Sequence, residues 1–377
     1  MGPSSERTQM SNHSHVDRVL DCPMDETPGA RELLEAAMQW HFSPETGSPF
    51  WLERAKKLDF DPRADVHTFD DLKLFPNVVN ELREVRAEDL IPRGYGSFDD
   101  LYGVYESGGT TGAPKRVVCM NDWMERWLTF SQRKLDERGC PRNVNWLALM
   151  PDGPHIFGAA LREGARRSGG ILFTIDMDPR WVKKCIGEGR AEDAGRYAEH
   201  LVNQARHLLE TQDVGVMITT PPLLERLAQD ERLVELINRK VSLIQWGGAH
   251  MDADTRHLFR TEVFPGVQLQ GAYGSTMILG GSLERVDTTG EDACVFDPLS
   301  PYISFSVIDP ATGENVPYGE RGQVVMNHIS KGMLLPNNLE RDTAVRMRPP
   351  EGQLGDSVAQ VAPVASFDDA AVIEGVY

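Results

Sequence analysis

Glu106-Ser-Gly-Gly-Thr-Thr-Gly-Ala-Pro-Lys115 is the stretch around which the rest of the chain is organised, and it follows the apolar run Leu101-Tyr-Gly-Val-Tyr105. Three glycines and three hydroxyl residues precede one lysine, so the backbone can turn sharply and direct several N–H and O–H donors into one small volume. Such a turn suits phosphate. It is not a Walker A loop, because Lys115 follows a proline and no Ser or Thr comes next. An exposed glycine-rich turn between two strands would explain the composition equally well.

The full string at 107–115, Ser-Gly-Gly-Thr-Thr-Gly-Ala-Pro-Lys, is more specific than its composition. It resembles the phosphate loop of the adenylate-forming superfamily, which includes acyl- and aryl-CoA ligases, peptide synthetase adenylation domains and luciferases. The resemblance implies that the cofactor is ATP, or AMP after reaction, and that Lys115 is a catalytic cation. It also implies that the nucleotide phosphates are bound by Ser107, Gly108, Gly109, Thr110, Thr111 and Gly112.

The composition is that of a globular protein with an acidic surface. Of 377 residues, 40% are hydrophobic and 25% are charged, and 39 basic against 57 acidic residues give a net charge of −18. This negative field repels nucleic acid and anionic membranes, so neither is expected as a partner. Five cysteines without C-x-x-C spacing argue against a zinc site, and no run reaches the ~18 apolar residues of a membrane span. A cytoplasmic protein is expected.

Strands, glycine-bearing turns and helices alternate through the middle of the chain. The apolar runs at 144–150, 214–219 and 241–246 are followed by turns and helical patterns, which is the sequence form of a largely parallel sheet. Together with the resemblance, this predicts an α/β fold, the large domain of adenylate-forming enzymes, with layered mixed and parallel sheets, flanking helices and a small β subdomain. We expect a disordered tail at 1–28, an N-terminal helical region at 29–95, a nucleotide-binding core at 96–290 and a β-rich subdomain at 291–377.

Two further glycine turns follow consecutive strands and can face one ligand. They read Gly247-Gly-Ala-His250 and Gly271-Ala-Tyr-Gly-Ser-Thr276. Glycine permits close backbone approach, an aromatic face can cover a purine, and hydroxyl groups can bind phosphate. The resemblance implies that Thr276 is a catalytic residue and that the nucleotide site also comprises Gly248, Ala249, His250, Gly271, Ala272, Tyr273, Gly274 and Ser275.

An aspartate is expected at the ribose of the nucleotide. The stretch Gly319-Glu-Arg-Gly-Gln-Val-Val325 is similar to a strand of the family, and Arg341-Asp342 follows it. The resemblance assigns to Asp342 the two ribose hydroxyls, and a carboxylate can accept both hydrogen bonds of such a diol. Asp356 is the rival for this role, but Asp342 lies at the better distance after the strand.

His155 follows the strand at 144–150 in the turn Pro151-Asp-Gly-Pro-His155. A histidine at a loop–helix junction can serve structure alone. The resemblance places it where relatives carry an aromatic residue or a histidine beside the carboxylate of the acid substrate. We favour this catalytic-site role, without general-base chemistry. The basic pairs Arg166-Arg167 and Lys183-Lys184 lie in helical patterns and are expected to be solvated.

The implied reaction joins a carboxylic acid to the α-phosphate of ATP and releases pyrophosphate, and relatives usually pass the acyl-adenylate to CoA or a carrier thiol. Positive charge, N–H donors and Mg²⁺ would offset the repulsion between the two anions. Met277 stands where most relatives have a glutamate that binds magnesium, and a thioether is too soft to replace it, so the metal ligands stay unknown.

The stretch from Asp368 to Tyr377 resembles the hinge that precedes a C-terminal domain in relatives, and we expect that domain to be absent. In relatives it carries a lysine used in adenylation. Loss of one preorganised charge typically costs ~10²–10³ in rate, so weak rather than absent adenylation is expected.

Within the superfamily the chain looks most like the phenylacetate-CoA ligase branch, and there like the short aryl-acid activating proteins of phenazine antibiotic biosynthesis. The predicted substrate is therefore an aromatic carboxylic acid, with CoA or a carrier protein as a further partner and a homodimer as a candidate assembly. The competing hypothesis is a non-catalytic nucleotide or acyl-adenylate binding protein, in which Met277 marks lost chemistry. A third hypothesis, a phosphotransferase, lacks a general base and paired carboxylates near the loop.

Overall fold

A six-stranded sheet forms the centre of the computed structural model, which describes residues 15–107, 113–286, 294–364, 366–367 and 370–371. Its strand order is β4-β3-β5-β6-β7-β8. The first five strands are parallel and β8 is antiparallel to β7. The strands span β3 (Trp146–Met150), β4 (Leu172–Asp176), β5 (Val216–Thr219), β6 (Leu243–Gly247), β7 (Gln268–Ser275) and β8 (Gly280–Leu283).

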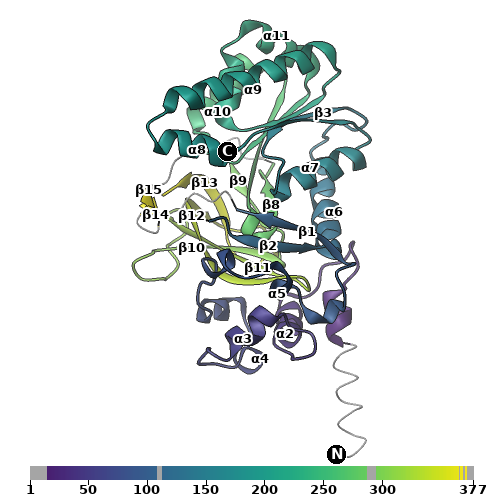
Figure 1. The fold of residues 1–377 in the computed structure, drawn as a ribbon, viewed down its shortest axis with the longest axis vertical. Coiled ribbons are helices and arrows are strands. Elements are labelled where there is room, and N and C mark those ends of the chain that lie inside the picture. Colours follow the sequence, from purple (N-terminus) through teal and green to yellow (C-terminus); the bar gives the residue numbers. More distant parts are fainter. Residues whose placement is uncertain (1–14, 108–112, 287–293, 365, 368–369, 372–377) are drawn as a thin grey trace, which may run out of the picture.

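Helices cover both faces of this sheet, as its continuous apolar strands require. Along β3, Trp146, Ala148 and Met150 belong to a cluster with residues of α6 and α7. The alternate residues Leu147 and Leu149 belong to the main core with residues of α9. Figure 1 shows α8 to α11 together at one end of the molecule. The helices are α6 (Asn121–Glu137), α7 (Ile156–Arg167), α8 (Pro179–Gly187), α9 (Ala191–Thr211), α10 (Pro221–Ala228), α11 (Glu231–Lys240) and α12 (Ala253–Leu258).

A second sheet of five antiparallel strands lies beside the first, in the order β10-β11-β12-β13-β9. Strand β12 is the longest, with 14 residues. The two sheets share the main hydrophobic core, to which Phe305, Val324 and Met326 contribute. The strands span β9 (Val295–Phe296), β10 (Ile303–Ile308), β11 (Arg321–Ile329), β12 (Leu334–Met347) and β13 (Ser357–Pro363). A short pair, β14 (Ser366–Phe367) and β15 (Ala370–Ala371), follows.

Short helices form the N-terminal region, at the end of the molecule opposite α8 to α11 (Figure 1). Thr68 and Asp71 form a reciprocal capping box at the start of η1. Phe75 ends that helix and packs on Phe42 and Trp51. The elements are α2 (Ala30–His41), α3 (Pro49–Ala55), α4 (Pro62–Asp65), η1 (Phe69–Leu74), η2 (Glu81–Arg83), α5 (Ala87–Leu90) and η3 (Arg93–Tyr95).

The segment expected to be a disordered tail is partly folded. Val16, Val19 and Leu20 are buried in the main core, and Cys22 is buried as well. The expectation of a tail at 1–28 therefore fails for these residues, because their apolar side chains cover core surface that water would otherwise reach. Residues 1–14 lie outside the described residues, as does most of the hinge-like stretch from Asp368.

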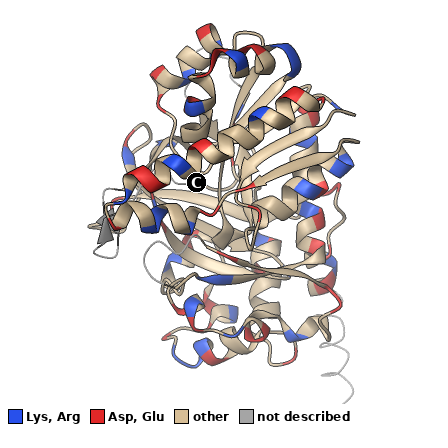
Figure 2. Ribbon diagram, turned by 45° about the horizontal axis from the view of Figure 1, so that its top comes forward, with Lys and Arg blue, Asp and Glu red and all other residues tan. Residues whose placement is uncertain are grey.

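The loop at 108–112 joins an antiparallel hairpin of β1 (Leu101–Glu106) and β2 (Arg116–Met120), whose last pair is Glu106 opposite Arg116. Acidic and basic residues are interspersed over the described helices rather than gathered by sign (Figure 2). Within the described ranges, no helix has both the length and the apolar composition needed to cross a bilayer.

Candidate functional site

The neck of the glycine-rich loop is closed by two hydrogen bonds between its ends. Ser107 N–H donates to the Lys115 carbonyl at 2.9 Å, and Lys115 N–H donates to Ser107 Oγ at 3.1 Å. Ser107 and Lys115, where the chain leaves β1 and approaches β2, are therefore held next to each other. Its predicted phosphate-binding members Gly108, Gly109, Thr110, Thr111 and Gly112 lie outside the described residues.

A cavity of about 400 Å³ opens at the carboxyl ends of the parallel strands, the edge at which open α/β sheets bind ligands. The turns after β3 and β6, the end of β7 and the middle of β12 all contribute to its walls. The predicted site residues that line it are Ser107, Lys115, His155, Gly248, Ala249, His250, Ala272, Tyr273, Gly274, Ser275, Thr276 and Asp342.

Gly271 is the described member of the predicted set that does not line this cavity. Its N–H donates to Glu284 Oε2 at 2.8 Å. A Cβ atom at this position would lie 2.9 Å from the Trp246 ring and 3.1 Å from the Phe296 ring. Gly271 therefore permits close packing of its backbone against these rings. It was predicted to contact the nucleotide, but it does not line the cavity.

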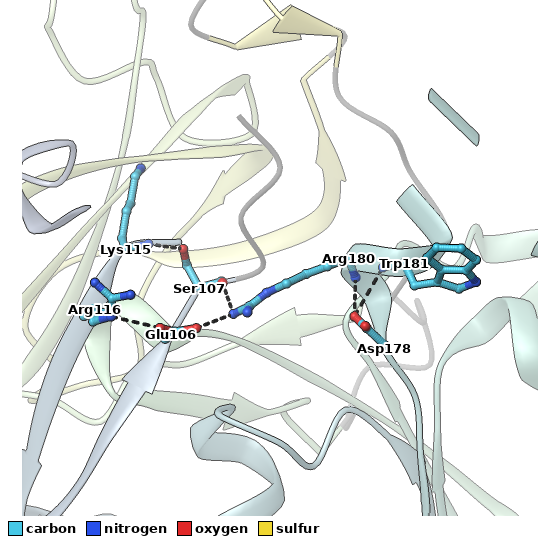
Figure 3. Close-up of polar contacts among 7 residues, drawn as sticks. All are labelled: Glu106, Ser107, Lys115, Arg116, Asp178, Arg180 and Trp181. Carbon is cyan, nitrogen blue, oxygen red and sulfur yellow. Dashed lines mark hydrogen bonds and ion pairs between the residues drawn. The ribbon is translucent and has the colours of Figure 1, made fainter. Parts of the chain in front are cut away.

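Glu106 forms an ion pair on each side at the base of the loop (Figure 3). Arg116 Nε donates to Oε1 at 2.9 Å, and Arg180 Nη2 donates to Oε2 at 2.8 Å. Burial alone would raise the pKa of Glu106, but the hydrogen bonds from Arg180 and Arg116 hold it below its ordinary value. The carboxylate is thus ionised and its charge is balanced by two guanidinium groups.

His155 lies at the N-terminus of α7 and lines the cavity. Burial and the Arg180 guanidinium lower its pKa below the ordinary value. A hydrogen bond to the main chain of Glu106 and the carboxylates of Asp176 and Asp178 act in the opposite direction. The imidazole is therefore neutral near pH 7, where it can donate or accept a hydrogen bond toward a ligand.

Tyr273 and Asp342 meet across the two sheets. Tyr273 Oη donates to Asp342 Oδ2 at 3.0 Å. Burial, with the negative charge of Asp342, raises the pKa of Tyr273 well above its ordinary value, so the phenol keeps its proton. The rival Asp356 lies elsewhere: it is buried, accepts a hydrogen bond from Arg346 Nε at 2.8 Å and does not line the cavity. This placement favours Asp342 over Asp356.

Lys183 is a cavity residue that the sequence did not suggest. The expectation of a solvated Lys183 is wrong, since its side chain is only 7% exposed and lines the cavity from α8. Burial and the charge of Arg341 lower the pKa of Lys183 to about 6. The sequence held one signal of this burial. Pro179 starts the helix one turn before Lys183, so the two residues lie on the same face, and both are buried. Lys184 is exposed as expected.

Helices α6 and α7 contribute mainly apolar side chains to the cavity wall. Trp127, Leu128 and Leu135 line it from α6, and Phe157 and Leu161 line it from α7. Leu128 and Leu135 are seven residues apart and Phe157 and Leu161 are four apart, so each helix presents one apolar face. A hydrophobic ligand group would fit here beside the polar turns.

Among the residues that the structure describes, no protein-built metal site is formed. Across the described part of the chain, no group of three or more His, Cys, Asp or Glu side chains could hold a metal ion. Met277 is buried in η5 (Thr276–Ile278), where its N–H donates to Ser275 Oγ at 3.2 Å. Its thioether is a poor ligand for magnesium, which prefers oxygen. The donor set therefore does not fit a resident Mg²⁺.

Comparisons with known proteins agree on one fold. No protein-family model matches the chain. A phenylacetate-coenzyme A ligase of Pseudomonas putida is 22% identical over 97% of this chain and 78% of its own length. A D-alanine–D-alanyl carrier protein ligase of Listeria welshimeri is 23% identical over 68% of this chain and 47% of its own length.

The solved structures extend this likeness to three dimensions. A 2-hydroxyisobutyryl-CoA ligase in an open conformation, in complex with 2-HIB-AMP and CoA, matches with a TM-score of 0.64 and 14% identity, over 90% of this chain and 74% of that one. The postadenylation state of the same ligase matches with a TM-score of 0.60. The chain therefore has the fold of the adenylate-forming CoA ligases.

Proposed function

We propose that this chain activates a carboxylic acid with ATP to give an acyl-adenylate and pyrophosphate. The observation that carries the proposal is the convergence of the loop neck (Ser107 and Lys115), His155, Tyr273 and Asp342 on one cavity at the carboxyl edge of the sheet. These residues come from four segments far apart in the sequence, and the fold is shared with ligases of this class.

The proposed chemistry depends on charge. The carboxylate oxygen of the acid attacks the α-phosphorus while the bond to pyrophosphate breaks, and both reactants are anions. Lys115 and Arg341 line the cavity and can offset this repulsion, whereas Lys183 carries a charge only near and below pH 6. Asp342 can accept hydrogen bonds from ribose hydroxyls, and His155 can donate one to the acid carboxylate. No step is assigned to a metal ion.

We propose an aromatic acid as substrate. The apolar side chains that α6 and α7 contribute to the cavity wall, Trp127 and Phe157 among them, support a hydrophobic ring next to the polar turns. A thiol such as CoA or a carrier protein would be the acceptor, as the names of the two curated relatives suggest. A role in phenazine antibiotic pathways is part of the proposal that rests on the sequence resemblance alone.

ATP–pyrophosphate exchange, screened over aromatic and aliphatic acids, tests the proposal. We expect acid-dependent exchange that falls by ~10²-fold or more in Lys115→Ala, because a charge facing the reacting phosphate is lost. Lys56→Ala is the control, since Lys56 is an exposed lysine paired with Glu53 on a distant helix end. Release of ADP instead of AMP would indicate phosphoryl transfer and contradict the adenylation proposal.

The second candidate is a protein that binds a nucleotide or acyl-adenylate without turning it over. Met277, buried in η5 where an oxygen ligand would serve magnesium, favours this candidate. ATP binding without exchange for any acid would support it and remove the enzyme proposal. Exchange with at least one acid would exclude it.

A further inference from the structure

We propose that Arg180 is a positioning residue that fixes both the base of the phosphate loop and His155, acting through Glu106. The inference rests on the proposed function, because it concerns the loop that would receive ATP. Arg180 lies 65 residues after Lys115 on a different element, and neither the motif nor its spacing identifies it. Its role is visible only in the folded chain.

One nitrogen of Arg180 serves two acceptors at the loop neck. Arg180 Nη2 donates to Glu106 Oε2 at 2.8 Å and to the Ser107 carbonyl at 3.2 Å. Figure 3 shows its side chain extended from α8 to the loop base, while Trp181 points away. A guanidinium is planar and rigid, so two contacts define where the Glu106 and Ser107 segment must lie.

The start of α8 is itself held in place. Asp178 caps the helix, because its Oδ1 accepts from Arg180 N–H at 2.9 Å and from Trp181 N–H at 3.2 Å. Asp178 N–H in turn donates to Tyr197 Oη on α9 at 3.0 Å. Arg180 thus projects from a fixed backbone rather than from a flexible segment.

Glu106 transmits this position to the turn that carries His155. Glu106 N–H donates to the Pro154 carbonyl at 2.8 Å, one residue before His155, and the His155 ring hydrogen-bonds to the Glu106 main chain. The side chain of Glu106 is held by Arg180, and its main chain holds His155. One ion pair therefore joins α8, the loop neck and the β3–α7 turn.

The charges explain why a carboxylate is tolerated next to a phosphate loop. Glu106 alone would repel a triphosphate, but with Arg116 and Arg180 the group carries one net positive charge. The Arg180 Nε–H is buried without a hydrogen-bond partner among the described residues, so the observed conformation of Arg180 leaves one of its donors unsatisfied. The Arg180 side chain is 34% exposed, and ion pairs of that exposure add little to stability. We therefore expect its effect in ligand binding and catalysis rather than in folding.

Arg180→Gln, Arg180→Lys, Glu106→Gln and the double variant Arg180→Gln/Glu106→Gln test the inference. The matched control is Arg206→Gln, because Arg206 also forms one ion pair of 2.7 Å, with Asp230, at 32% exposure and away from the cavity. Four quantities are measured: the melting temperature, the Kd for ATP, and the kcat and KM of exchange.

We expect Arg180→Gln to melt like the control while exchange falls about tenfold or more, the size of a lost charge-assisted hydrogen bond. Most of the loss should be in kcat, since the loop and His155 are misplaced rather than removed. Arg180→Lys should restore part of it. If Arg180 acts through Glu106, the double variant loses no more than the worse single variant.

Titration of His155 by NMR, assigned with His155→Gln, adds a readout that a purely structural role would not move. The groups that act on this ring are Arg180, Asp176, Asp178 and the main chain of Glu106. Loss of Arg180 removes a charge that disfavours the protonated form, so the pKa of His155 should rise in Arg180→Gln and stay unchanged in Arg206→Gln.

Two results would overturn the inference: exchange and ATP binding of Arg180→Gln equal to those of Arg206→Gln, or additive losses in the double variant. If Arg180→Gln does not fold, additivity can no longer be measured, and Glu106→Gln with the kcat and ATP Kd of the Arg206→Gln control would overturn the inference. Absence of exchange in the wild type would remove the proposed enzyme function alone. ATP affinity and the His155 titration would then decide the positioning role.

Discussion

Tyr273 donates its phenolic hydrogen to Asp342 across 3.0 Å, from β7 of the six-stranded sheet to β12, the longest strand of the antiparallel one. The sequence placed these residues separately, one at the adenine and one at the ribose. In the folded chain they form one unit at the mouth of the cavity. Any ligand that uses the Asp342 carboxylate must share it with an internal donor.

Substitution of Asp342 is expected to weaken ATP binding more than substitution of Tyr273. Asp342→Asn removes a charged acceptor for two ribose hydroxyls, which corresponds to a loss of roughly 10- to 100-fold in affinity. Tyr273→Phe keeps the ring and frees the carboxylate, so the loss should be less than about tenfold. Isothermal titration with ATP measures both. Asp309→Asn, in an exposed turn, is the control, and an Asp342→Asn variant with the control's Kd would exclude the ribose role.

Lys183→Met is expected to stabilise the protein at pH 7. The pKa of Lys183 is about 6 in the folded chain against an ordinary value of 10.5. Between these values the unfolded chain binds one more proton, so stability falls by ~1.4 kcal/mol per pH unit as the pH drops through that window. Methionine has no proton to release on folding, so Lys183→Met removes this loss of stability. Urea unfolding should show a gain on the order of a few kcal/mol at pH 7 that narrows at pH 9.5.

Lys184→Met is the control for this experiment, since Lys184 is the exposed neighbour on the same helix. The Lys183 variant should bind ATP more weakly only near and below pH 6, where Lys183 carries its charge. Equal pH dependence of stability in the Lys183 and Lys184 variants would show that Lys183 is not a proton-releasing group of the folded state.

Met277→Glu is expected to make exchange more strongly dependent on magnesium. A carboxylate in η5 would supply the oxygen ligand that the thioether cannot. Met277→Gln is the matched control, because it has similar size and polarity without the charge. Exchange is measured over a magnesium titration in all three proteins. The same magnesium profile for the Glu and Gln variants would show that position 277 does not face the metal.

Two buried histidines should make the protein less stable in acid. Burial lowers the pKa of His41 to about 4 and that of His328 to about 3. His328 donates from Nδ1 to the Ile278 carbonyl at 2.6 Å, and His41 donates from Nε2 to the Ser330 carbonyl at 2.8 Å. Both are neutral in the folded state and become protonated on unfolding below pH 6.5.

Stability from each histidine is therefore lost as the pH falls from 6.5 toward its folded pKa, at ~1.4 kcal/mol per pH unit. Urea unfolding at pH 7, 6 and 5 measures the slope. His41→Gln should remove the contribution of one histidine to this slope. His207→Gln, on the exposed face of α9, should leave the slope unchanged. A slope that His41→Gln does not alter would contradict the assignment.

Local patterns in the sequence were sufficient to predict much of the fold. The apolar strand runs are confirmed, because hydrophobic periodicity acts over a few residues. The α/β fold of the adenylate-forming enzymes is confirmed as well. Cavity positions such as Tyr273 and Asp342 followed from the motif resemblance, whereas their mutual hydrogen bond did not.

Contacts between residues far apart in the chain could not be predicted from the sequence. Lys183 was expected in water because a basic pair in a helical pattern usually is, but its burial depends on packing of α8 beside the cavity. Arg180 carried no local signal at all, since its partners Glu106 and Ser107 lie 74 and 73 residues away. Gly271 matched the motif, yet a Cβ atom at this position would lie against the Trp246 and Phe296 rings rather than in the cavity. Sequence shows which residues follow one another, and the fold decides which ones meet.

The length of β12 bears on how the molecule would respond to a ligand. The carbonyl of its first residue, Leu334, accepts a hydrogen bond from Trp51 Nε1 at 3.0 Å. Asp342 lies eight residues farther along the same strand. Eight residues of strand span up to ~26 Å. β12 is hydrogen-bonded to β11 along much of its length and to β13 over the half that includes Asp342. A contact made at the cavity is thus mechanically continuous with the N-terminal helices, which makes Trp51 a natural fluorescent reporter of events at a site it does not touch.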